Sequence, residues 1–374
     1  MIGSTLRGTH SFGSWLRAMA DLERAGRYAR GAARWARLVT RGAPRPGVRV
    51  FYGHDRVPEP GEAVAGGTAK FQRLAQRFPN DPTDFSLLYL GSTWLPRDLG
   101  PLLRLARRRR IPLLVNQNGV GYPGWAGGAT ESFNAPLRKI LAEAAHVLYQ
   151  SEFCKRAADE WVGSTTGTWE VLHNAVDVDL FTPADRDPEG GPVLLLGGDQ
   201  YQAYRLELGL ETLAAVLTSH PEAQLLVTGR LVVPIEPTID RLGLHGRVHV
   251  LGRYTQADAP ALFRRAHLLL HTKVNDPCPS LVLEAMAAGL PVVYPRSGGV
   301  PELVGADAGI GVPHPDGFER DEPPSPEALA EAVGKVLADL PAFAAAARGR
   351  AVAHFPLAPW LDRHAELFER FAPL

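Results

Sequence analysis

The chain has 374 residues, of which 45% are hydrophobic, and its 40 lysines and arginines balance its 40 aspartates and glutamates. This length allows two domains with separate hydrophobic cores, and a net charge of zero gives no indication of a nucleic-acid partner. The two cysteines, Cys154 and Cys278, form no disulfide framework and suit a reducing compartment such as the cytoplasm. No apolar run approaches the roughly 18 residues of a membrane span, and the N-terminus has no signal-peptide pattern.

Residues 1–46 form a basic segment, with nine arginines against Asp21 and Glu23. Apolar residues and arginines recur there at helical spacing, which predicts a helical N-terminal extension. A basic amphipathic helix can lie on an anionic membrane surface, which would hold the protein peripherally on the inner face of the membrane. The alternative is a helix that packs on the adjoining domain and turns its arginines to solvent.

Apolar runs of strand length alternate with helical periodicity through residues 47–185, a pattern typical of parallel βαβ units. Strands are expected at 48–52, 85–90, 111–116 and 146–150, and helices at 68–78, 99–110 and 134–144. Ligands in such sheets bind beyond the carboxyl ends of the strands. The glycine-rich loops after residues 52 and 116 lie at such ends.

A stretch rich in Pro, Gly and acids at 183–192 is interpreted as a linker, and a second alternating set follows it. Its strands are expected at 193–196, 224–228, 248–251, 268–271 and 290–294, and its helices at 206–219, 236–242, 257–266, 285–289 and 326–339. Aromatic residues at helical spacing predict a last helix at 355–371. The fold class is therefore α/β, with two doubly wound domains.

The segment 276–302, DPCPSLVLEAMAAGLPVVYPRSGGVPE, carries the clearest functional signal. Asp276 and Glu284 are separated by seven residues and enclose a Pro-Cys-Pro-Ser turn. The later Ser-Gly-Gly turn would place free backbone N–H groups at a helix N-terminus, where an anion is stabilised. Carboxylates bind sugar hydroxyls, so the combination points to a phosphate-bearing sugar. Taken singly, the first acid could cap a turn and the second could be an N-terminal helix charge.

Three other segments extend this pattern into a resemblance. Residues 171–183 read VLHNAVDVDLFTP, residues 145–156 read AHVLYQSEFCKR, and a Gly-Gly pair precedes a helical stretch near residue 68. With the two acids, these motifs resemble the retaining family 4 glycosyltransferases, which have the GT-B fold of two Rossmann-like domains with a cleft between them. The resemblance implies three parts: the basic extension 1–46, an acceptor-side domain 47–185 completed by the C-terminal helix 355–374, and a nucleotide-sugar domain 186–354.

The resemblance also implies roles for single residues. Asp276 and Glu284 become the catalytic pair, with Asp276 on the donor-sugar hydroxyls and Glu284 on the ribose hydroxyls of the nucleotide. Further groups of the donor site are expected at Gly66, Gly67, Cys278, Ser280 and Leu281.

The sequence departs from the family where the diphosphate should be neutralised. Gly198 stands in place of an arginine and Leu208 in place of a lysine, and the first acid is Asp276 where glutamate is usual. Arg205 and Lys273 are the nearest candidates to replace the missing pair. If neither reaches the phosphates, the chain is a sugar-nucleotide-binding protein that has lost catalysis.

The acceptor side is read from the loop after the third expected strand. Asn116-Gln117-Asn118 replaces the histidine often found there in the family, and Asn118 is expected to hydrogen-bond the acceptor. Tyr122 and Trp125 either stack on an acceptor sugar or pack in the fold. On the donor side, Arg253 is expected to border the nucleobase.

We therefore expect a metal-independent, retaining glycosyltransferase that moves a hexose from a UDP- or GDP-sugar to a glycan or lipid-linked acceptor, in cell-surface polysaccharide synthesis. No cofactor is implied, and Asp177-Val178-Asp179 lies inside the interdomain motif, so metal binding is not expected there. An epimerase or hydrolase acting on nucleotide sugars is the rival enzyme on the same fold. The Asn-Gln-Asn stretch argues against it, because these residues make poor acids and bases.

Overall fold

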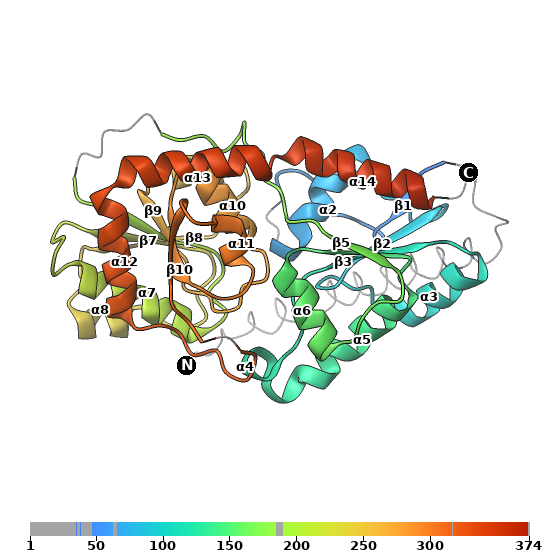
Figure 1. Ribbon diagram of the computed structural model, residues 1–374, viewed down its shortest axis with the longest axis horizontal. Helices are drawn as coiled ribbons and strands as arrows, with labels where there is room; N and C mark the ends of the chain where they lie inside the picture. Colours follow the sequence, from blue (N-terminus) through green and yellow to red (C-terminus); the bar gives the residue numbers. More distant parts are fainter. Residues whose placement is uncertain are drawn as a thin grey trace, which may run out of the picture.

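The computed structural model describes residues 47–62, 66–184, 190–315 and 317–372, together with Trp35 and Leu38. The predictions of a helical extension at 1–46 and of its membrane contact otherwise lie outside the described residues. The described chain forms two parallel β-sheets, side by side, each with helices on both faces (Figure 1). In this part of the chain, no helix combines the length and hydropathy that a membrane span requires.

The first sheet has five parallel strands in chain order. They are β1 (Val50–Phe51), β2 (Leu87–Gly91), β3 (Leu113–Gln117), β4 (His146–Tyr149) and β5 (Thr168–Val171). Strands β1 to β4 are buried along their whole length, as their largely apolar sequences predict. The edge strand β5 is half exposed, so its sequence TWEV has no apolar run, and the sequence analysis missed it.

Helices cover both faces of this sheet. On one face lie α3 (Leu99–Arg108), α5 (Thr130–Glu143) and α6 (Glu152–Trp161). On the other face lie α2 (Gly66–Arg77) and the C-terminal α14 (Leu357–Phe371). Two short turns of helix, α4 (Pro123–Ala126) and η1 (Gly127–Ala129), follow β3.

The second sheet has the order β11-β10-β9-β6-β7-β8. Its strands are β6 (Val193–Leu196), β7 (Gln224–Thr228), β8 (Val248–Gly252), β9 (Leu268–Leu270), β10 (Val292–Pro295) and β11 (Gly309–Val312). The chain moves outward in one direction from β6 to β8 and in the other from β9 to β11. The reversal lies between β6 and β9, and this is where doubly wound sheets bind their ligands.

Helices cover this sheet on two faces as well. They are α7 (Ala203–Val216), α8 (Glu236–Leu242) and α12 (Pro326–Ala338) on one side, and α9 (Ala259–Phe263), α10 (Ser280–Ala287), α11 (Val300–Val304) and α13 (Leu340–His354) on the other. The sequence analysis missed α13, whose residues are mostly alanine without a clear apolar stripe.

Two consecutive helices connect the domains along one side. In Figure 1, α13 runs over the second sheet and α14 continues over the first. The contact of α14 is both aromatic and polar: the Tyr89 hydroxyl lies 2.9 Å from His364 Nε2, and the rings of Tyr89 and Phe368 pack edge to face. The end of the chain therefore belongs to the core of the first sheet.

The domains also meet along the opposite side, where the loop after β11 reaches α4 (Figure 1). Phe318 of this loop is buried in the core of the first domain, against Tyr122 and Phe153. The backbone N–H of Gly124 donates to the Phe318 carbonyl at 2.8 Å. At the centre of the seam, the Glu302 carboxylate accepts the backbone N–H groups that begin α6.

We expect Phe318→Ala to lower the free energy of unfolding by about 3 kcal/mol, because it leaves a cavity in the core of the other domain. Urea denaturation of the full chain measures this. Val352→Ala, on an exposed position of α13, is the control and should change stability by less than about 0.5 kcal/mol. Equal effects of the two changes would show that Phe318 does not anchor the loop.

Candidate functional site

Buried polar atoms without a hydrogen-bond partner gather at the carboxyl ends of three neighbouring strands, β9, β6 and β7. Within the described residues they are Gln200 Oε1, Arg205 Nε, Thr228 Oγ1, His271 Nδ1 and Thr272 Oγ1. Buried polar groups are nearly always paired in folded proteins, and leaving one unpaired costs free energy. Such a cluster beside the reversal of strand order therefore indicates that a polar ligand completes this edge of the sheet.

Asp276 lies in the turn that follows β9, beside this cluster. Lys273 Nζ lies 3.1 Å from Asp276 Oδ1, and His271 Nε2 lies 3.3 Å from Oδ2. Burial alone would raise the pKa of Asp276, but Lys273, His271 and Arg205 outweigh it and hold the pKa well below its usual range. The carboxylate is therefore charged at neutral pH and held in place by cationic neighbours.

Arg205, in the first turn of α7, is the second predicted cation. Its guanidinium is buried, and Nη1 donates to the Asp199 carbonyl at 2.8 Å. Burial lowers its pKa, while nearby Asp276 acts in the opposite direction. The structure thus brings the two predicted replacements, Arg205 and Lys273, to the same carboxylate.

Glu284 lies on α10 and is also buried, but its contacts are weaker. Arg73 from α2 of the first domain and Gln256 of the second both approach Glu284 Oε1 at 3.4 Å. Burial raises the pKa of Glu284, and Arg73 counteracts only part of this. The charge of this carboxylate therefore destabilises the ligand-free protein.

The turn between the two acids is shaped from both domains. Leu281 packs against the loop after β6, where a Cβ on Gly197 would lie 2.8 Å from its Cδ1. Gly198 has a φ of +81°, so an arginine at this position would be strained. Ser280 is the first residue of α10, and the Cys278 carbonyl accepts from Asn174 Nδ2 of the interdomain segment at 2.8 Å.

The remaining donor-side predictions lie around this core. Arg253 is exposed and forms an ion pair with Asp199, at 2.9 Å, on the loop after β6. Gly66 and Gly67 begin α2, and a Cβ on Gly67 would lie 2.6 Å from Thr93 Oγ1. In the described part of the chain, no hydrogen bond or ion pair links these three positions to either acid.

The acceptor-side residues are separated by the fold. Asn118 follows β3, and its backbone N–H donates to Ser92 Oγ at 2.9 Å. Tyr122 is buried against Phe318, so its ring has the packing role and not a free stacking face. Trp125 is 41% exposed and retains an accessible face.

A buried network that the sequence analysis missed lies between these regions. Lys70 Nζ donates to Asn116 Oδ1 at 2.6 Å, Gln150 donates to the same oxygen, and Asn174 donates to Gln150 Oε1. Burial lowers the pKa of Lys70 to about 8. Its position one turn into α2 marks it in the sequence only as a cation on a helix. The network joins α2 to the turn between the acids through Asn174.

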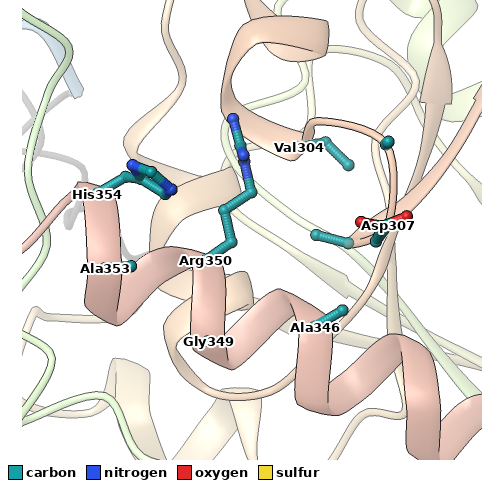
Figure 2. Close-up of a pocket in the computed structure, with 9 residues that line it drawn as sticks. Val304, Asp307, Ala346, Gly349, Arg350, Ala353 and His354 are labelled. Atoms are coloured by element: carbon teal, nitrogen blue, oxygen red, sulfur yellow. The ribbon is translucent and has the colours of Figure 1, made fainter.

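A separate pocket of about 300 Å³ lies between α13 and the loop after α11 (Figure 2). Asp307, Arg350 and His354 line it among small residues. Arg350 Nη2 donates to the Glu302 carbonyl at 2.8 Å, so the guanidinium already caps the end of α11. The pocket contains none of the predicted site residues. Across the described chain, no group of three His, Cys, Asp or Glu side chains could hold a metal ion.

Glu284→Gln should stabilise the ligand-free protein at neutral pH. The raised pKa means that wild-type stability is complete below the unfolded value of 4.5 and falls as pH rises, because the unfolded state ionises first. Thermal unfolding from pH 4 to 8 should show the two melting temperatures together at low pH and the variant higher above it. A variant that melts lower than wild type at pH 7 would show that the ionised Glu284–Arg73 pair is net stabilising.

Comparisons with known proteins agree with this geometry. Residues 183–348 match the family model of the Glycosyl transferases group 1. The D-inositol 3-phosphate glycosyltransferase of Mycobacterium sp. (strain KMS) is 30% identical over 233 residues, 56% of this chain and 52% of that protein. The phosphatidylinositol N-acetylglucosaminyltransferase protein of Arabidopsis thaliana is 24% identical over 222 residues, 58% of this chain and 47% of that protein. The chain thus spans about half the length of these curated relatives.

The fold is shown by solved structures. The Anabaena protein HepE, crystallised in complex with UDP and glucose, superposes with a TM-score of 0.63 at 20% identity, over 76% of this chain and 78% of that one. This confirms the predicted GT-B fold. With that fold and the family model on its second domain, the chain belongs to the family 4 glycosyltransferases, group 1.

Proposed function

We propose that the protein transfers a hexose from a nucleotide-diphosphate sugar to an acceptor hydroxyl, with retention of anomeric configuration. The observation that carries this proposal is the cluster of unpaired polar atoms around Asp276 at the reversal of the second sheet. A sugar nucleotide supplies hydroxyls, phosphates and a base within one ligand and satisfies such a set. In this proposal residues 186–354 bind the donor, and residues 47–185 with 355–374 bind the acceptor.

Asp276 accepts hydrogen bonds from the donor-sugar hydroxyls, and Lys273 and Arg205 supply positive charge for the diphosphate. Backbone N–H groups at the start of α10 add fixed dipoles where negative charge develops on the leaving group. The bond from sugar C1 to the β-phosphate oxygen breaks while C1 bonds to the acceptor oxygen on the same face. The acceptor proton passes to the departing phosphate, so the reaction needs no basic side chain near Asn118.

Glu284 accepts from the ribose hydroxyls in this scheme. Its ligand-free contacts with Arg73 and Gln256 are long, so two hydroxyl donors can replace them with shorter hydrogen bonds. Because Arg73 comes from the first domain, binding of the ribose and the seam between the domains are coupled.

Relatives suggest the kind of acceptor. Those of Mycobacterium and Arabidopsis are named for inositol phosphate and phosphatidylinositol. We therefore propose a polyol or lipid-linked acceptor, as in the assembly of cell-surface glycans. A cytoplasmic protein held at the membrane by residues 1–46 would meet such lipids.

A second candidate, a sugar-nucleotide-binding protein without catalysis, is favoured by one observation. Lys273 and Arg205 both lie beside Asp276, and that carboxylate offsets part of their charge. Release of free UDP from a UDP-hexose in the presence of an acceptor separates the two candidates.

UDP should raise the melting temperature of the wild-type chain, by mass action worth about 2.7 kcal/mol at roughly 100 times Kd, and UMP should raise it less. Arg205→Ala and Lys273→Ala should reduce the response to UDP more than the response to UMP, because they remove charge from the diphosphate. Thermal-shift titration with UDP, UMP, GDP and GMP measures this. Arg241→Ala, which removes surface ion pairs on α8, is the matched control. No response to either diphosphate would rule out the proposed donor.

A further inference from the structure

The loop that follows β11 carries one carboxylate into the candidate site. Asp321 Oδ1 is buried and has no hydrogen-bond partner within the described residues. Asp321 Oδ2 accepts only a long hydrogen bond from Gln202 Nε2, at 3.4 Å. A buried carboxylate oxygen without a donor is costly, so its retention indicates a donor that arrives with a ligand.

The surroundings of Asp321 are those of the donor site. The charge of Lys273, which lies against Asp276, also acts on Asp321, and both carboxylates act on the Tyr122 hydroxyl. Gln202 precedes α7, on the same loop that leads to Arg205. Asp321 and Asp276 thus share one cationic neighbour at the carboxyl edge of the second sheet.

The strap, which we define as residues 317–325, is fixed at several points. Asn275 Nδ2, from the turn before Asp276, donates to the Gly317 carbonyl at 3.0 Å. Phe318 is anchored in the first domain, and a Cβ on Gly124 would lie 2.9 Å from the Asp321 backbone nitrogen. The strap therefore holds Asp321 against both domains, and it does not present this residue on a free surface.

We propose that Asp321 is a second sugar-binding carboxylate, which accepts a hydrogen bond from a hydroxyl of the donor hexose and contributes to the choice of sugar. This inference rests on the proposed function. A carboxylate suits the task because it accepts from a hydroxyl donor more strongly than a neutral oxygen does. The nucleotide part of the donor makes no use of it.

Binding of UDP and of UDP-glucose to the full chain, measured by calorimetry, tests the inference; GDP and GDP-mannose replace them if the wild type responds to guanine nucleotides. Asp321→Ala and Asp321→Asn should raise the Kd for UDP-glucose by roughly tenfold or more and leave the Kd for UDP unchanged. Glu322→Gln, an exposed neighbour on the same strap, is the matched control and should change neither.

Equal weakening of UDP and UDP-glucose would overturn the inference, because it would show that Asp321 only shapes the site. Unchanged donor binding with a raised KM for the acceptor would overturn it too and would assign the carboxylate to the acceptor sugar. A wild-type chain that binds neither UDP nor GDP would instead overturn the proposed function, and this inference with it.

Discussion

The turn at residues 277–279, between the two acids, is where the domains are joined, and the rest of the site depends on it. Ser151 Oγ donates to the Pro277 carbonyl at 2.7 Å, and Asn174 Nδ2 donates to the Cys278 carbonyl at 2.8 Å. Both donors come from outside the second sheet. The position of Asp276 and the start of α10 is therefore set by contacts with the first domain, and a shift between the domains would change the geometry of the site.

The two acids are held in opposite electrostatic conditions. Cationic neighbours stabilise the charge of Asp276, whereas burial with only distant partners destabilises the charge of Glu284. Together with the unpaired atoms of Gln200, Thr228 and Thr272, this leaves the ligand-free edge of the sheet short of hydrogen-bond donors and acceptors. Functional sites commonly carry such a cost, because groups that a ligand satisfies have no partner before it binds.

The sequence was sufficient to predict the α/β class, most buried strands and the family, because apolar runs and the acid-turn-acid segment depend on local sequence. The roles given to the site residues remain predictions. What could not be predicted depends on contacts distant in sequence: Phe318 is buried only because it crosses to another core, and this contact gives Tyr122 its packing role. Arg73, Lys70 and Asp321 match no motif, and only the fold brings them to the site.

Hydrogen–deuterium exchange of the wild-type chain, with and without a UDP-hexose, tests the location of the site most directly. The account predicts slower exchange in the loop after β6, in the turn through residues 273–285 and at the start of α2. It predicts no change around the pocket that Arg350 lines (Figure 2). Protection confined to that pocket, or no protection under conditions where the nucleotide sugar binds, would contradict the assignment of the donor site to the carboxyl edge of the second sheet.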